Sequence, residues 1–141
     1  MMRIFIDTNI LLDLMLRREP FYAKAQLIYQ LGVWGDVELF VSDLTIVNCM
    51  YIAMRQKVAL DNIYDFMQEM RKHIFISGIG EEVIDKAINA KSKDFEDIVQ
   101  YYSAQNCNAD YVVTRNKNDF PNDIIPVIEP EDMVGMFYEI N

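Results

Sequence analysis

The feature that most constrains the fold is a short apolar run that ends in a carboxylate near the N-terminus. Residues 4–6 (Ile-Phe-Ile) have the β-branched and aromatic side chains of a strand buried on both faces. The run stops at Asp7, Thr8 and Asn9, and apolar residues resume over 10–16 with helical spacing. Ligands of α/β proteins bind at the carboxyl ends of strands, so Asp7 is a candidate functional residue. A helix N-cap role for Asp7 or Asn9 is the structural alternative.

The rest of the chain repeats this alternation of strands and helices. Predicted strands cover 37–41, 73–77, 110–114 and 124–128, and predicted helices cover 20–31, 43–57, 60–70, 81–90, 94–106 and 133–138. Pro20 is expected in the first turn of the second helix, and Pro126 places the last strand at an edge of the sheet. This order predicts a parallel sheet with helices on both faces, in one domain that spans residues 1–141.

The composition is that of a globular protein. Of the 141 residues, 52% are hydrophobic, which provides a real core and excludes a disordered chain. No apolar run approaches the roughly 18 residues that span a membrane, and no charged leader precedes the first strand. Cys49 and Cys107 lack the spacing of a metal site. We therefore expect a cytoplasmic protein with reduced thiols and no membrane association.

The net charge narrows the possible partners. The chain has 22 acidic and 13 basic side chains, which gives a formal charge of −9. This charge argues against bulk electrostatic attraction to nucleic acid. It remains compatible with a nucleic-acid enzyme whose acidic residues gather at a metal site, and it suits a partner that presents a basic segment.

Acidic side chains recur at three places where a helix or loop begins. The first is Asp7. The second is the pair Asp94 and Asp97, which lie three residues apart and therefore share a helix face. The third runs from Thr114 to Asp119, directly after the fourth predicted strand. Because the carboxyl ends of parallel strands lie at one edge of the sheet, these groups can meet in one cleft.

A cluster of this kind favours a divalent cation. Two carboxylates about 5 Å apart repel each other by roughly 3 kcal/mol at an effective dielectric constant near 20. Without a cation, a cluster of carboxylates would therefore protonate or separate. Oxygen ligands without a Cys or His set suit Mg²⁺ or Mn²⁺, which can activate water and stabilise charge on a phosphodiester.

Each acidic residue also has a purely structural explanation. Asp94 can cap a helix with Asp97 at its third position, where acidic side chains are favoured. Asp119 can form an Asx turn before Pro121. His73, the single histidine, begins a predicted strand without a nearby Cys or Asp, and we interpret it as structural.

These segments, in this order, resemble the PIN domain, and within it the VapC-like group of toxin ribonucleases. Residues 5–13 resemble the family's opening strand and its metal-binding Asp, and 42–48 resemble its Ser-x-x-Thr-x-x-Glu helix start. Residues 94–104 resemble the third segment, with Asp97 at the usual ligand position, and 112–120 resemble the fourth. The resemblance covers nearly the whole chain.

The resemblance implies an α/β/α sandwich with a central, mostly parallel sheet, and Mg²⁺- or Mn²⁺-dependent cleavage of RNA. It also implies a homodimer, and an antitoxin whose basic inhibitory segment would suit the charge of −9. The ion would be held by Asp7, Asp97 and Asp119, with Asp94 or Glu96 as a supplement. The residues that would orient these ligands are Thr8, Asn9, Ser42, Asn48, Thr114 and Asn116.

Two positions depart from the family pattern. Asn48 lies where the family usually has Glu, and Asn116 lies where many members have Asp. An amide oxygen can coordinate Mg²⁺ but adds no negative charge, so the sequence favours one firmly held ion and reduced activity. Arg115 and Lys117, together with Arg17, are candidate contacts for substrate phosphates.

Other functions compete with the nuclease. A catalytically weak PIN-like protein that only binds RNA or a partner would explain the two asparagines. A phosphoacceptor receiver domain has similar length and layering, but it needs an acidic pair after the first strand and a Lys after the fifth. A haloacid-dehalogenase-type phosphatase needs a second Asp two residues after the first, where this chain has Asn9.

Overall fold

The computed structural model of the protein describes residues 1–138 and contains a five-stranded parallel sheet. The strands are β1 (Arg3–Ile6), β2 (Glu38–Ser42), β3 (Ile74–Ser77), β4 (Tyr111–Val113) and β5 (Val127–Ile128). Their spatial order is β3-β2-β1-β4-β5, and every neighbouring pair is parallel. The apolar run that opens the sequence is therefore the central strand, and Phe5 aligns with Phe40 on one side and Val112 on the other.

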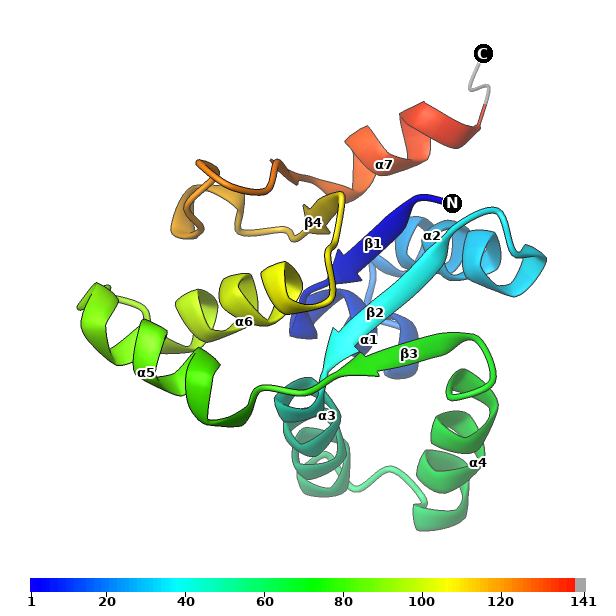
Figure 1. Ribbon diagram of the computed structural model, residues 1–141. Coiled ribbons are helices and arrows are strands. Elements are labelled where there is room, and N and C mark those ends of the chain that lie inside the picture. The colour runs from blue at the N-terminus through cyan, green and yellow to red at the C-terminus, as the bar shows by residue number, and fades with distance from the viewer. Residues whose placement is uncertain (139–141) are drawn as a thin grey trace.

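Helices cover both faces of this sheet (Figure 1). They are α1 (Thr8–Met15), α2 (Tyr22–Trp34), α3 (Asp43–Arg55), α4 (Leu60–Met70), α5 (Gly80–Ala90), α6 (Phe95–Asn106) and α7 (Pro130–Phe137), with a 3₁₀ turn, η1, at Lys117–Asp119. Side chains of α5 and α6 pack on one face, and those of α1 to α4 and α7 pack on the other. The predicted α/β/α sandwich with a parallel sheet is confirmed.

Successive side chains of β1 point to opposite faces of the sheet, so they belong to two separate parts of the core. Ile4 and Ile6 belong to the core beneath α1, α2, α4 and α7, whereas Phe5 points into the core beneath α5 and α6. All three side chains are at most 3% exposed. A strand buried on both faces needs this continuous apolar run, and the first polar residue after it falls at the edge of the sheet.

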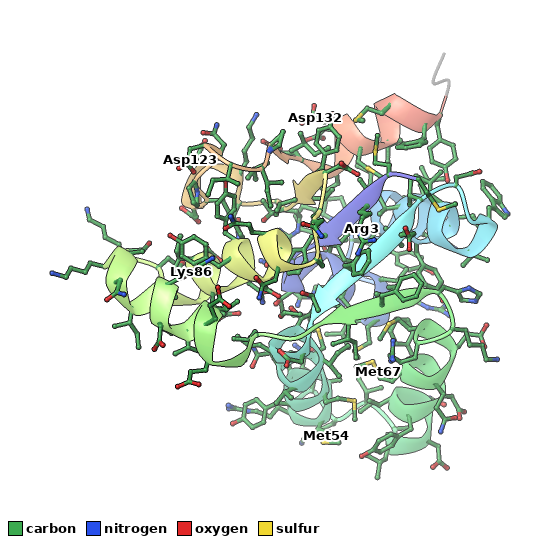
Figure 2. The ribbon with its side chains drawn as sticks, viewed as in Figure 1. Arg3, Met54, Met67, Lys86, Asp123 and Asp132 are labelled. Carbon is green, nitrogen blue, oxygen red and sulfur yellow. The ribbon has the colours of Figure 1, made fainter. Side chains whose placement is uncertain are left out.

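Both cysteines and three of the nine methionines, Met67, Met70 and Met133, are buried in the core. Met67 of α4 is 7% exposed, whereas Met54 of α3 is 43% exposed, and Figure 2 labels both side chains. Cys49 and Cys107 are both buried free thiols, as the sequence predicts. Among residues 1–138, no helix combines the length and hydropathy needed to cross a membrane.

Two helix boundaries differ from the prediction. The helix expected from Pro20 begins at Tyr22, because the chain first turns: Arg17 has a positive φ of 52°, and the amide of Phe21 donates to the carbonyl of Arg18 over 2.9 Å. The helix expected to reach Lys57 ends at Arg55, since Lys57 itself is left-handed at φ 59°.

The last strand and the last helix also differ from their predicted bounds. The strand predicted over 124–128 forms only at Val127–Ile128, directly after Pro126, which has no amide hydrogen to donate. This strand, β5, lies at an edge of the sheet, as the proline indicates. The last helix extends further toward the N-terminus than predicted, because Pro130 occupies its first turn. Residues 139–141 of the predicted domain lie outside the described residues.

Candidate active site

The candidate site starts at Asp7, the residue that follows β1. Its carboxylate accepts hydrogen bonds from the amide of Thr8 at 2.8 Å and from the hydroxyl of Thr114 at 2.9 Å. Asp7 is thus the N-cap of α1, and its second oxygen is held by the end of β4. Only 4% of Asp7 is exposed, and this burial raises its pKa to about 6 in spite of both hydrogen bonds.

The second pair of acids begins α6. Asp94 is the N-cap of this helix and accepts a hydrogen bond from the amide of Asp97 at 3.0 Å. The side chain of Asp97 lies about one turn further along α6, where it lines a cleft at the carboxyl edge of the sheet. Burial, and then the negative charges of Asp7, Asp94 and Asp119, raise the pKa of Asp97 to about 8. The four carboxylates come from three separate segments and line the same cleft.

The structure brings most of the predicted residues into a single cleft of about 460 Å³ at the carboxyl edge of the sheet. Asp119 reaches this cleft from η1, whose turn is closed by the amide of Asp119 donating to the carbonyl of Asn116 at 2.9 Å. The lining residues are Asp7, Thr8, Asn9, Leu12, Asn48, Tyr51, Ile52, Asp94, Glu96, Asp97, Asn116 and Asp119.

A buried network of neutral groups lies behind the carboxylates. The hydroxyl of Thr45 lies 2.8 Å from that of Thr8 and accepts from Ser42, whose oxygen also caps α3. The amide of Gln100 donates to Thr8 at 3.1 Å and to Thr45 at 3.0 Å. This network joins the starts of α1 and α3 to α6, and therefore fixes Asp7 relative to Asp97 by way of Thr8 and Gln100.

Sequence reasoning did not select Gln100 as a site residue. Its signal was a polar side chain between Val99 and Tyr101, within the stripe of α6 that faces the core. Gln100 is fully buried, and its carbonyl oxygen has no hydrogen-bond partner among the described residues. A helix pattern alone does not show that two threonines from distant segments meet this side chain.

The two asparagines that depart from the family pattern both reach the cleft. The side-chain amide of Asn48 donates to Glu96 at 3.3 Å. The backbone amide of Asn116 donates to the hydroxyl of Thr114 at 3.0 Å, and Thr114 in turn donates to Asp7. Asn116 therefore supports Asp7 through its backbone.

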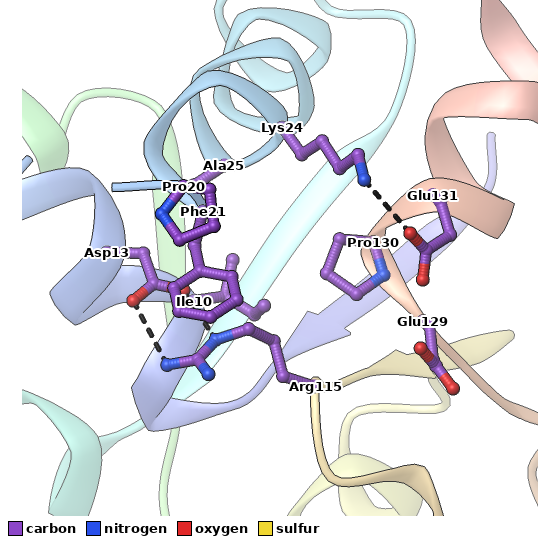
Figure 3. Close-up of a pocket in the computed structure, with 10 residues that line it drawn as sticks. All are labelled: Ile10, Asp13, Pro20, Phe21, Lys24, Ala25, Arg115, Glu129, Pro130 and Glu131. Atoms are coloured by element: carbon purple, nitrogen blue, oxygen red, sulfur yellow. Dashed lines mark hydrogen bonds and ion pairs between the residues drawn. The ribbon is translucent and has the colours of Figure 1, made fainter. Parts of the chain in front are cut away.

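The predicted phosphate contacts lie elsewhere. Arg115 lines a separate pocket of about 260 Å³, where it donates to Asp13 at 2.8 and 3.2 Å and lies 3.7 Å from the ring centre of Phe21 (Figure 3). Lys117 is exposed on η1, and Arg17 lies against Tyr22 in a groove on the α2 side. Their role as phosphate contacts stays a prediction.

The charges and donor types of the cleft fit a divalent cation. None of the ion pairs among residues 1–138 uses Asp7, Asp94, Asp97 or Asp119. Within the same residues, no three acidic, histidine or cysteine side chains stand close enough together to enclose an ion directly. Mg²⁺ keeps several waters and takes about one or two protein carboxylates, so the donors fit an ion held partly through water.

The protein is therefore an α/β protein with a parallel α/β/α sandwich fold. Its carboxylates gather in a cleft at the carboxyl edge of the sheet, and such a cleft suits a divalent cation. More particularly, the model of the PIN domain family matches residues 3–118, and the chain belongs to this family. A search of the curated proteins finds no match.

Solved structures share this fold. A toxin–antitoxin complex from Klebsiella pneumoniae has a TM-score of 0.66 at 22% identity, covering 96% of this chain and 98% of that chain. VapBC2 from Rickettsia felis, bound to a promoter DNA fragment, has a TM-score of 0.63 at 15% identity, covering 91% and 98%. VapC20 from Mycobacterium tuberculosis, a sarcin-ricin loop cleaving toxin, has a TM-score of 0.59 at 12% identity, covering 85% and 91%.

Proposed function

We propose that this protein is a metal-dependent endoribonuclease that hydrolyses RNA phosphodiester bonds. The observation that carries the proposal is Asp7, a carboxylate 4% exposed whose hydrogen bonds come only from neutral donors among the described residues. Beside it, Asp97 has a pKa raised by burial and by three neighbouring carboxylates. A cation is the simplest compensation for such a group.

Each residue of the cleft has a defined part in this proposal. Asp7, Asp97 and Asp119 would hold Mg²⁺ or Mn²⁺, partly through water, with Asp94 as a supplement. The bound ion would activate water and stabilise charge on the phosphodiester. Thr114 holds one oxygen of Asp7, and the Thr8 amide holds the other, so the carboxylate cannot rotate away from the cleft. Gln100 and Thr45 keep α6 in place behind it.

The proposal further makes the protein the toxin of a toxin–antitoxin pair. The support is the fold shared with a toxin–antitoxin complex and with VapC20, together with the charge of −9. An antitoxin with a basic segment would neutralise the cleft by the same electrostatics as a metal ion. A homodimer is proposed by family analogy alone.

The experiment is cleavage of RNA by the purified protein with Mn²⁺. We expect cleavage that requires the metal and is lost in Asp7→Asn. The control is Asp65→Asn, which removes an exposed carboxylate from α4, outside the cleft. Cleavage that continues after removal of the metal, or that Asp7→Asn leaves unchanged, contradicts the proposal.

A second candidate function is supported by Asn48 and Asn116, which reduce the negative charge at the cleft. In that case the protein binds RNA or a partner and cleaves little. Calorimetry with Mn²⁺ separates the two: binding that is lost in Asp97→Asn favours the nuclease, and no binding favours the inactive alternative.

A further inference from the structure

We infer that Glu96 supplies the cleft carboxylate that is absent at position 48, and that Asn48 positions it. The inference rests on the proposed metal-dependent nuclease and adds a residue to its metal site. Asn48 belongs to α3 and Glu96 to the first turn of α6, so two helices far apart in sequence meet here. Both residues line the acidic cleft together with Asp7 and Asp97.

The contact between the two side chains sets the direction of Glu96. The amide nitrogen of Asn48 donates to a carboxylate oxygen of Glu96 over 3.3 Å. Successive residues on a helix point about 100° apart, so Glu96 can face the α3 wall of the cleft while Asp97 faces Asp7. The two adjacent acids of α6 both line this cleft.

The charge of Glu96 is not compensated by a basic side chain. None of the ion pairs among residues 1–138 includes Glu96. An exposed glutamate at the start of α6 could extend into solvent, yet this one lies against an amide donor within an acidic cleft.

The residue types at positions 48 and 96 are complementary. A glutamate at 48 would place a second carboxylate about as close to Glu96 as the present amide is, and two such charges repel strongly. An asparagine removes this repulsion and donates a hydrogen bond instead. The two positions together thus carry one negative charge, the same as a glutamate at 48 beside a neutral residue at 96.

The test moves this charge from one helix to the other. Glu96→Gln is expected to weaken Mn²⁺ binding by about 10-fold to 100-fold, the range seen when groups around a metal site are removed. The double variant Asn48→Glu, Glu96→Gln restores the charge at 48, and the amide introduced at position 96 can donate to the new carboxylate. Its affinity should return most of the way to that of the original protein.

The measurement is Mn²⁺ affinity by calorimetry on the full chain, with the thermal midpoint of the metal-free protein as a check on folding. Glu81→Gln is the matched control, because it removes the same charge from the first turn of the neighbouring helix α5. Asn48→Ala should weaken Mn²⁺ binding while the thermal midpoint stays near that of the original protein. This combination would show that Asn48 positions Glu96 and is not needed for folding.

The outcomes separate this inference from the proposed function. If Asp7→Asn loses Mn²⁺ and Glu96→Gln binds it as well as the original protein, the inference is overturned and the nuclease stands. A folded Glu96→Gln variant that loses affinity, with a double variant that recovers none, also overturns the shared-charge account. If the original protein binds no Mn²⁺, the inference and the proposed function fail together.

Discussion

Asp7 and Asp13 lie at the two ends of helix α1, are both almost fully buried, and are compensated in opposite ways. Asp7 is 4% exposed and Asp13 is 1% exposed. Asp13 receives two hydrogen bonds from the guanidinium of Arg115, at 2.8 and 3.2 Å, and Arg18 lies 3.9 Å away. Asp7 receives hydrogen bonds from an amide and a hydroxyl, at 2.8 and 2.9 Å.

The difference lies in the groups that surround each buried carboxylate. Burial raises the pKa of both side chains, and the hydrogen bonds and charge of Arg115 act against that rise at Asp13. A buried carboxylate needs a compensating charge. At Asp13 the protein provides that charge by direct contact with Arg115, whereas at Asp7 the effect of Arg115 is weaker than the opposing effect of Glu96. Under the proposed function, Asp13 stabilises the α1–β4 junction and Asp7 would bind the cation.

The largest expected effect is at the compensated aspartate. Arg115→Met leaves Asp13 buried without its main partner, and breaking such a pair costs about 3 to 5 kcal/mol of unfolding free energy. Urea unfolding measures this cost. The double variant Arg115→Met, Asp13→Asn should recover much of it, because the unpaired charge is gone. A loss below about 1 kcal/mol in the single variant, as for an exposed pair, would contradict the comparison.

The next effect is at the uncompensated aspartate. Asp7→Asn should weaken Mn²⁺ binding by at least about 100-fold, the upper end of what groups around a metal site contribute. Asp13→Asn, further along the same helix, should leave Mn²⁺ binding nearly unchanged. Calorimetry on both variants gives the contrast directly. Equal losses in the two would show that these aspartates do not have separate roles.

A smaller effect is expected from the network behind Asp7. Gln100→Leu removes the link from α6 to Thr8 and Thr45, so Asp97 can shift relative to Asp7 and Mn²⁺ affinity should fall by about 10-fold. Ser103→Ala is the control, since Ser103 ties the same helix to Ser77 of β3. It should cost about 1 kcal/mol of stability and leave the affinity intact.

The last prediction is a dependence of stability on pH in the metal-free protein. The folded-state pKa values of Asp7, about 6, and Asp97, about 8, lie above their ordinary value of 3.8. Between about pH 4 and about pH 8, the folded protein therefore binds more protons than the unfolded chain. The free energy of unfolding consequently falls as the pH rises over this range. The thermal midpoint should therefore fall steadily over this range of pH.

Two variations test this origin of the pH dependence. Asp97→Asn should flatten the profile, because the group with the higher pKa is removed. Saturating Mn²⁺ should raise the midpoint most at about pH 8, where the uncompensated carboxylates are charged. A metal-free midpoint that rises over the same pH range would contradict the raised pKa values.

Local patterns predicted the fold and the first residues of the candidate site. The apolar run at residues 4–6 gave the central strand, and the acids after it and at Asp94 were both functional candidates and expected caps. The structure shows that these two interpretations are compatible, since Asp7 caps α1 with one oxygen and lies in the cleft. The spacing of residues within a single segment is enough to predict a strand, a helix cap and a candidate site residue.

Pairings between distant segments could not be predicted in this way. Arg115 follows a strand end near the acids and was expected to contact phosphate, but its partner Asp13 lies 102 residues earlier. Asn48 and Glu96 are 48 residues apart, and the sequence showed only that one was an unusual amide and the other a spare acid. Which polar groups meet depends on helix packing, which hydrophobic periodicity does not specify.

Proton release on metal binding tests the central claim most directly. Calorimetry of Mn²⁺ binding at about pH 7 in two buffers of different ionisation enthalpy counts the protons released. A carboxyl whose pKa is about 8 is mostly protonated at that pH, so an ion that binds Asp97 must displace its proton. We expect release of about one proton at about pH 7 that declines toward zero by about pH 9. Binding without proton release, or no binding at all, would contradict the account.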